Sequence, residues 1–193
     1  TAGHIILSSM CAYALAKKQF PGRDMIFRFI VVSLMFNATV TAIPNYIIMA
    51  KLHWIDSTIA LFVPAMAAPL GLYLMKQFME QSVPDAVIEA ARIDGASQWK
   101  TFWGIVMPSV KPAWLTLLLL SVQSLWNTGG GSFIFSEEKK TLSYALHQMA
   151  AGGLARAGVS AAVSVMMMCV PVGVFIFSQS NIIETMTSSG MKD

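Results

Sequence analysis

The chain has 193 residues with a formal net charge of +3, and 55% of its residues are hydrophobic while only 12% are charged. A soluble domain carries about 25% charged residues, so this composition excludes an ordinary soluble protein and indicates a membrane protein. The basic residues flank apolar runs and form no dedicated patch, so the net charge gives no reason to expect a nucleic-acid partner.

Five charge-free runs predict membrane-spanning helices, because crossing a bilayer takes about 20 mostly apolar residues whose backbone hydrogen bonds are satisfied internally. In chain order the runs are 1–16, 30–50, 57–75, 112–136 and 157–183. The first run is short for a crossing and starts without Met, so we expect at least one preceding helix to be missing. The predicted fold is all-α, a polytopic membrane helical bundle forming one domain over residues 1–193.

Positively charged residues assign the two faces, because Lys and Arg cluster in the short cytoplasmic loops of membrane proteins. One set of alternating connections holds Lys17, Lys18, Arg23, Arg28, Lys76, Arg92, Lys100, Lys111 and Lys192. The other set holds only Lys51, Lys139, Lys140 and Arg156. We therefore expect the connection 76–111 to lie in the cytoplasm, and 127–150 to face outward.

The connection 76–111 reads as a helix, a bend and a second helix. Ser82 is expected to cap the first helix and Gly95 to end it, because Gly adopts the left-handed conformation without steric cost. Ser97 can cap a second helix. Its apolar residues Trp99, Phe102, Trp103 and Val106 recur at helical spacing until Pro108 breaks the pattern.

These helices suggest two surfaces. The three aromatic residues of the second helix would suit the headgroup boundary, so this helix is expected to lie flat on the membrane surface. The first helix would project and enter a groove of a partner. An ordinary surface loop with an internal Glu89–Arg92 ion pair remains the alternative on periodicity alone.

A longer pattern runs through this connection: Glu89-Ala90-Ala91, three residues, Gly95, nine residues, Ile105, two residues and Pro108. It resembles the EAA loop of binding-protein-dependent ABC transporter permeases. "EAARIDGAS" resembles the carbohydrate branch, especially the maltose-type permease subunit. "AYALAKKQFPGR", "IPNYIIMAKLHWIDST" and Trp126-Asn127 have family counterparts too, whereas Met107 replaces the usual Leu. The resemblance implies the type I ABC importer permease fold, with five of six transmembrane helices in this chain.

Family membership would make this loop the element that couples the membrane helices to a cytoplasmic ATPase. Glu89 would make polar contacts with the ATPase, Ala90 and Ala91 would permit close approach, and Gly95 would set the bend. The full set of candidate coupling residues is Glu89, Ala90, Ala91, Arg92, Asp94, Gly95, Ile105 and Pro108.

The same resemblance implies the partners and the location. The partners are a cytoplasmic ABC ATPase dimer, a second permease subunit in a heterodimer, an extracytoplasmic solute-binding protein and membrane lipid. The outer connection 127–150 would reach toward the binding protein, with Gly129 and Gly131 giving mobility and Glu137 to Lys140 giving charge. The expected location is a bacterial or archaeal cytoplasmic membrane, which the chain crosses several times.

The chain has no energy source of its own. It contains no Gly-rich phosphate-binding loop and no acidic residue within a span to relay protons. ATP and Mg would therefore be used by the partner ATPase, and we expect this chain to be no enzyme and to bind no cofactor. No metal site is expected, because His4, His53 and His147 are scattered along the sequence.

Polar residues within the spans are candidates for a solute path, because sugars need neutral hydrogen-bonding groups. The candidates are Asn37, Thr41, Asn45, Ser121, Gln123, Ser124 and Asn127. Buried polar residues also join transmembrane helices, which remains the alternative for each of them. The resemblance of "EAARIDGAS" to the carbohydrate branch favours a sugar or oligosaccharide importer. The other possibilities are a permease for a peptide, amino acid or anion, and a membrane bundle without transport activity.

Overall fold

The computed structural model describes residues 1–127, 133–150 and 157–190, and in these ranges it contains helices and no strand. The helices are α1 (Ala2–Lys17), α2 (Arg23–Ser33), α3 (Ala38–Lys51), α4 (Ile59–Met66), α5 (Pro69–Ser82), α6 (Asp85–Ile93), α7 (Gln98–Thr101), α8 (Met107–Ser109), α9 (Lys111–Asn127), α10 (Leu142–Ala150) and α11 (Ala157–Gly190). A π-helical turn, Phe102–Val106, joins α7 to α8. The prediction of an all-α fold is confirmed.

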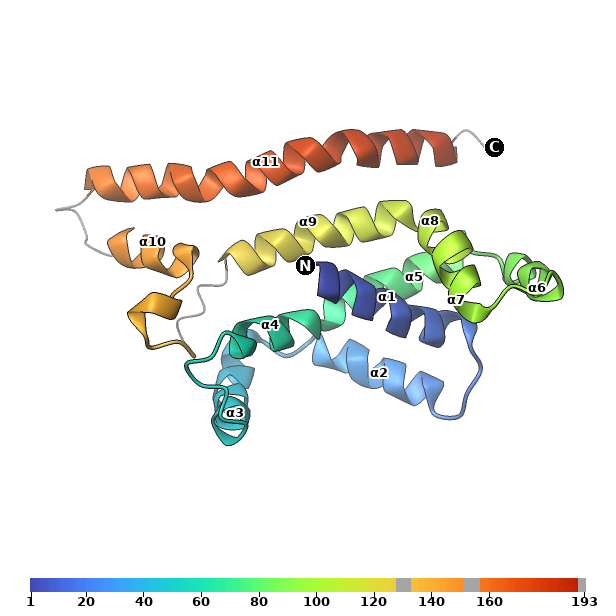
Figure 1. Cartoon of the computed structure of the whole chain (residues 1–193), viewed down its shortest axis with the longest axis horizontal. Coiled ribbons are helices and arrows are strands. Elements are labelled where there is room, and N and C mark those ends of the chain that lie inside the picture. The colour runs from blue at the N-terminus through green and yellow to red at the C-terminus, as the bar shows by residue number, and fades with distance from the viewer. Residues whose placement is uncertain (128–132, 151–156, 191–193) are drawn as a thin grey trace.

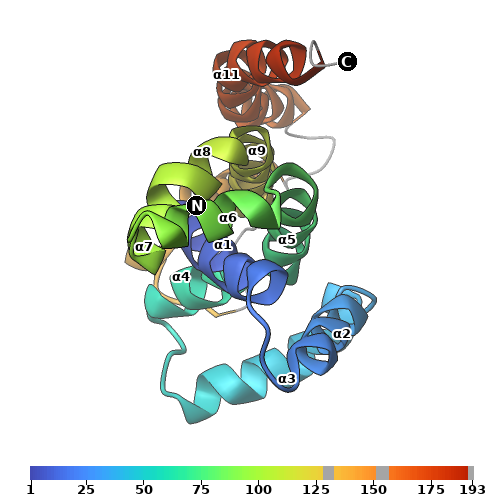
Figure 2. The same ribbon diagram turned by 90° about the vertical axis from the view of Figure 1, so that its right-hand side faces the viewer.

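The long helices run along one axis of an elongated molecule. Figure 1 shows α1, α5, α9 and α11 along this axis, with α6 and α7 at one end and α10 at the other. In Figure 2 the layers are seen end-on, with α11 beyond α9 on one side and α2 and α3 on the other. The connection that holds α6 and α7 and the described part of the outer connection, 133–150, therefore lie at opposite ends of the bundle.

The buried core lies where α1, α5 and α9 meet the connection that follows α6. Its members are Ile5, Ala12, Tyr13, Met75, Met79, Val83, Phe102, Val106, Val110, Ala113 and Leu117. Close van der Waals packing of this kind holds membrane helices together, because lipid removes most of the hydrophobic driving force between them. The connection thus contributes directly to the core.

A broken helix packs against α1. The break between α4 and α5 leaves the last carbonyls of α4 without helical donors. The Nδ1 atom of His4, a side chain only 4% exposed, lies 3.0 Å from the carbonyl oxygen of Met66, so a ring protonated there donates to it. Gly71 allows this approach, because a Cβ at that position would overlap the His4 imidazole.

Helix length tests the predicted spans. Among the described residues, Ile59–Ser82 and Ala157–Ile176 are long and apolar enough to cross a membrane. Gln98–Ser109 and Lys111–Asn127 form a further candidate that is bent by 78°. The helix α1 has 16 residues and α3 has 14, so both are shorter than a full crossing. The count of five spans therefore stays a prediction.

Three predicted boundaries are wrong. The run 30–50 is interrupted, because Asn37 caps α3 by accepting a 2.9 Å hydrogen bond from the Thr39 amide. The run 112–136 is not helical throughout, because residues 133–136 lie outside any helix. The connection that starts at Lys76 begins only after Ser82, because α5 continues and buries Lys76 against Glu80, 2.6 Å away, and the ring of Phe27.

The outer end is tied together by Asp56, which lies between α3 and α4 with a φ of 57°. Its carboxylate accepts hydrogen bonds from the hydroxyl and amide of Ser136 and from the Phe135 amide, and Lys139 donates to its carbonyl oxygen at 2.7 Å. The Ser136 hydrogen bonds hold the pKa of the Asp56 carboxyl well below its usual range. The predicted mobility at Gly129 and Gly131 lies outside the described residues.

Substituting Gly71→Ala should destabilise the fold by about 1–3 kcal/mol, because the added methyl group displaces a buried imidazole. Gly173→Ala is the matched control, since nothing lies within 4 Å of a Cβ there. Thermal unfolding in detergent should show a lower melting temperature for the first variant only. Equal melting temperatures would contradict the close packing of α1 on α5.

Substituting Asp56→Gly should release the outer connection, because Gly tolerates the same backbone conformation and removes every acceptor on the side chain. Hydrogen exchange at the Phe135 and Ser136 amides should accelerate roughly tenfold or more, while Glu138→Gln leaves it unchanged. Because the pKa of the Asp56 carboxyl is lowered in the folded chain, the charged carboxylate stabilises the connection fully at pH values above the usual aspartate pKa. This stabilisation is lost only as the pH falls through the lowered pKa. Protection in the wild-type chain should therefore persist at about pH 4, where an ordinary aspartate is half protonated.

Candidate functional site

The bend after α6 is built by backbone hydrogen bonds around Gly95, whose φ is 75°. The Ala96 amide donates to the Ala91 carbonyl at 2.9 Å, and the Gly95 amide donates to the Arg92 carbonyl at 3.1 Å. This pair of bonds defines a Schellman motif, which needs a left-handed residue at the position of Gly95. The predicted bend is confirmed.

The predicted cap residue is correct for α7 and wrong for α6. Ser97 caps α7 as expected, its hydroxyl accepting from the Lys100 amide at 3.3 Å. Ser82 does not cap α6, because it is the last residue of α5, and Pro84 occupies the cap position without a side-chain hydrogen bond. The α5 helix simply continues further than its apolar pattern suggested.

The second half of the connection is anchored in the core. Phe102 is 3% exposed and its ring centroid lies 5.4 Å from that of Tyr13 in α1, while Val106 is fully buried. Trp99 and Trp103 remain exposed. The prediction that all three aromatic residues share a membrane-surface face is therefore wrong, because the boundary of the core passes between Phe102 and its two tryptophan neighbours.

Pro108 does not end this helix. The π-helical turn before it carries the Met107 amide back to the Phe102 carbonyl, and the chain stays helical through Ser109. Ile105 is half-buried and Pro108 is exposed, and the sharp turn into α9 comes one residue after Ser109.

The base of α6 is fastened to the bundle at two points. Ala91 is buried and the half-buried Ile88 packs against the core, so the inner face of α6 contacts the body of the protein. Asp85 forms a 2.8 Å ion pair with Lys17 at the end of α1, and the Lys17 side chain is only 5% exposed. A displacement of α6 must therefore act on α1.

The outer face of α6 is exposed and chemically mixed. Glu89, Ala90, Arg92 and Asp94 are all exposed, and no ion pair joins Glu89 to Arg92 in this described stretch. Ile93 is 86% exposed at the tip. Sequence reasoning missed Ile93, although an isoleucine between Arg92 and Asp94 was a visible signal, since a large apolar side chain among charges suggests contact with a partner.

The candidate solute-path residues fall into two separate places. Thr41 and Asn45 lie in α3 and Asn37 is its cap, whereas Ser121, Gln123, Ser124 and Asn127 lie in α9. Figure 2 shows α3 well apart from α9, so the structure does not bring the two groups together. Ser121 is buried, while Gln123, Ser124 and Asn127 are exposed within this chain.

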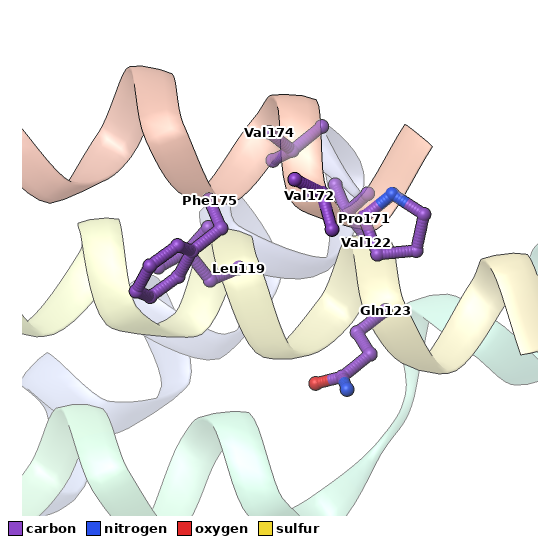
Figure 3. A pocket seen from close by; sticks show the side chains of 7 residues that line it. All are labelled: Leu119, Val122, Gln123, Pro171, Val172, Val174 and Phe175. Carbon is purple, nitrogen blue, oxygen red and sulfur yellow. The ribbon is translucent and has the colours of Figure 1, made fainter. Parts of the chain in front are cut away.

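Gln123 lines a groove in the described part of the chain. The groove lies between α9 and α11, has a volume of about 250 Å³ and is lined by Leu119, Val122, Gln123, Pro171, Val172, Val174 and Phe175. In Figure 3 the Gln123 amide extends from α9 away from the α11 side chains. An amide can form hydrogen bonds with hydroxyl-bearing solutes, so Gln123 stays a candidate for the solute path.

The sequence is similar to permease subunits of bacterial transport systems. The sn-glycerol-3-phosphate transport system permease protein UgpE of Yersinia enterocolitica is 36% identical over 127 residues, or 66% of this chain and 45% of that protein. The UgpE protein of Pectobacterium atrosepticum is 35% identical over the same length. The chain thus spans about half the length of the curated relatives it matches.

The fold has a solved counterpart as well. A bacterial ABC transporter involved in the import of the acidic polysaccharide alginate contains a chain that matches with a TM-score of 0.73 at 24% identity, covering all of this chain and 69% of that one. The family of binding-protein-dependent transport system inner membrane components matches residues 4–185. The match covers most of the chain and both ends of the bundle, and the chain belongs to this family of inner membrane transport components.

Proposed function

We propose that this chain is a permease subunit of an ATP-driven ABC importer that moves a sugar or oligosaccharide across the cytoplasmic membrane. The observation that carries the proposal is the α6 tip. Its outer face exposes Ile93 and three charged residues, while its base is fastened to α1 by the Lys17–Asp85 pair. Because α6 projects from the bundle and is also attached to α1, it could transfer a movement of the ATPase to the membrane helices.

The α6 helix would dock into a cleft of the ATPase. Ile93 and Val87 supply apolar contacts, Glu89, Arg92 and Asp94 supply polar ones, and Ala90 permits close approach. The burial of Phe102 against Tyr13 and the turn into α9 then carry a displacement of α6 into the bundle. ATP binding would bias the membrane helices between inward-facing and outward-facing packing.

The wider assembly follows from the same proposal. A cytoplasmic ATPase dimer would meet α6, and a second permease subunit would complete the membrane domain. An extracytoplasmic solute-binding protein would meet the opposite end, where Asp56 holds the outer connection. The chain would cross the membrane several times with α6 inside the cell, and ATP with Mg would be bound by the ATPase alone.

The solute class is supported by the lack of charge along the candidate path. Neutral groups dominate the candidate path, because the segments 38–50, 112–127 and 157–176 contain no charged residue. Such a path suits a neutral saccharide better than an anion, although the named relatives carry sn-glycerol 3-phosphate and the structural counterpart imports an acidic polysaccharide. An importer of another solute, such as an anion, amino acid or peptide, is the second candidate.

Substituting Ile93→Ser should weaken association with the ATPase subunit about tenfold, because truncating a central apolar contact costs 1 kcal/mol or more. Leu142→Ser is the matched control, since Leu142 is 63% exposed at the opposite end of the bundle. Titration of purified ATPase against the permease in nanodiscs measures both. Equal affinities for the two variants would contradict docking through α6.

Substituting Gly95→Val should uncouple the two activities, because a β-branched residue is strained at this positive φ by roughly 1–3 kcal/mol. Gly95→Asn is the control, since Asn tolerates the left-handed conformation. Solute transport per ATP hydrolysed in liposomes should fall several-fold for the valine variant only. Normal coupling in the valine variant would show that the bend has no part in transmission.

The solute class is tested by ATPase activity of the assembled complex in liposomes with its binding protein. The panel contains maltose, longer maltodextrins, alginate oligosaccharides, sn-glycerol 3-phosphate, a dipeptide and an amino acid. Stimulation by a saccharide supports the proposal. Stimulation only by sn-glycerol 3-phosphate, the dipeptide or the amino acid would contradict it.

A further inference from the structure

Pro171 leaves one backbone carbonyl of α11 without its helical hydrogen-bond donor. Proline has no backbone N–H, so the carbonyl four residues earlier, that of Met167, loses its helical donor. Water is absent from the bilayer interior, and an unsatisfied carbonyl there costs several kcal/mol. Some group from outside α11 must therefore satisfy Met167 if this part of the helix lies in lipid.

Trp126 supplies that group. Its indole Nε1–H donates to the Met167 carbonyl oxygen at 2.8 Å, across 41 positions of sequence. Trp126 lies near the end of the described part of α9, and the hydroxyl of Ser143 in α10 donates to its carbonyl oxygen at 2.6 Å. One residue thus links α9 both to the first turn of α10 and to the interior of α11 at Met167.

We propose that Trp126 is a positioning residue of the transport cycle, whose indole N–H replaces the backbone donor that Pro171 lacks and makes α9 and α11 move as one unit. The proposal rests on the proposed coupling function, because α9 follows directly from the connection that holds α6. A displacement that enters α9 from this connection then reaches the segment of α11 around Pro171.

The hydrogen bond and the packing beside it have separate effects. Figure 3 shows Pro171 and Phe175 of α11 above Leu119 and Val122 of α9, so apolar contact also joins the two helices. Apolar side chains can slide past one another at small cost, whereas a hydrogen bond in lipid fixes one register. The indole N–H, and not the aromatic ring, is therefore the part of Trp126 that sets the position.

A double-substitution experiment isolates this bond. Trp126→Phe keeps the ring and removes the donor, so the melting temperature in detergent should fall by about 3–8 °C. Pro171→Ala restores a backbone donor for Met167, so the double variant should regain most of this loss. Trp114→Phe, alone and with Pro171→Ala, is the matched control on the same helix and should show no rescue. A Trp126→Phe variant that melts like the wild-type chain, or a double variant without rescue, would overturn the proposal.

Movement is measured separately, because a purely structural bond would change stability alone. Nitroxide labels at positions 120 and 165, both exposed, are introduced into a variant lacking Cys11 and Cys169 and assembled with its ATPase subunits in liposomes. The distance between labels should be the same without nucleotide and after trapping with ATP and vanadate. With Trp126→Phe the two distances should differ by several ångströms, and they should still differ when Pro171→Ala is added, because the backbone donor that it restores lies within α11 and joins no second helix.

The two hypotheses fail in different ways. Nucleotide-independent label distances in the Trp126→Phe variant would contradict the positioning role even if transport is normal. A wild-type complex that hydrolyses ATP without response to any solute would contradict the proposed function, while the label distances still decide whether α9 and α11 move together.

Discussion

Burial of Phe102 and Val106 against α1 and α5 makes the connection after α6 a part of the helix bundle. Without this contact, a displacement of α6 would reach the membrane helices only through the Lys17–Asp85 ion pair and the short join to α5. With it, the exposed tip at Ile93 and the buried ring of Phe102 belong to one short structure, whose angle is set by the left-handed Gly95. The proposed coupling function depends on this combination of an exposed end and a buried end.

Lipid imposes a second constraint, because backbone groups freed at helix breaks must find partners within the protein. The carbonyl of Met66 at the α4–α5 break is met by His4, and the carbonyl that Pro171 frees is met by Trp126. Each break therefore creates a link to a neighbouring helix. A position where helical hydrogen bonding is interrupted is thus hydrogen-bonded to a neighbouring helix. Such links suit a bundle whose helices must move together.

The sequence predicted features that depend on local backbone chemistry. Gly95 and Ser97 were identified correctly, because a left-handed turn and a helix cap need particular residue types at particular positions. The inward orientation of Phe102 could not be predicted, because periodicity groups it with Trp99 and Trp103 without showing where the core lies. The break at Asn37 was hidden as well, since apolar residues on both sides made 30–50 read as one continuous span.

Tertiary contacts explain the remaining differences. The burial of Lys76 depends on Phe27 and Glu80, which come together only when α2 packs on α5. The Trp126–Met167 hydrogen bond joins residues 41 positions apart in the sequence, so no local sequence pattern could predict it. Asn37 and Gln123 looked equivalent as polar residues within spans, but one caps a helix and the other lines a groove.

The central claim is that α6 meets the ATPase through its tip, and a photo-crosslinking amino acid at position 93 tests it most directly. In the assembled complex in liposomes, illumination should join this chain to the ATPase subunit, with a yield that changes when ATP and vanadate trap the closed dimer. The same amino acid at position 142 should give no such product. Absence of a crosslink from position 93 in a complex that hydrolyses ATP would contradict the account.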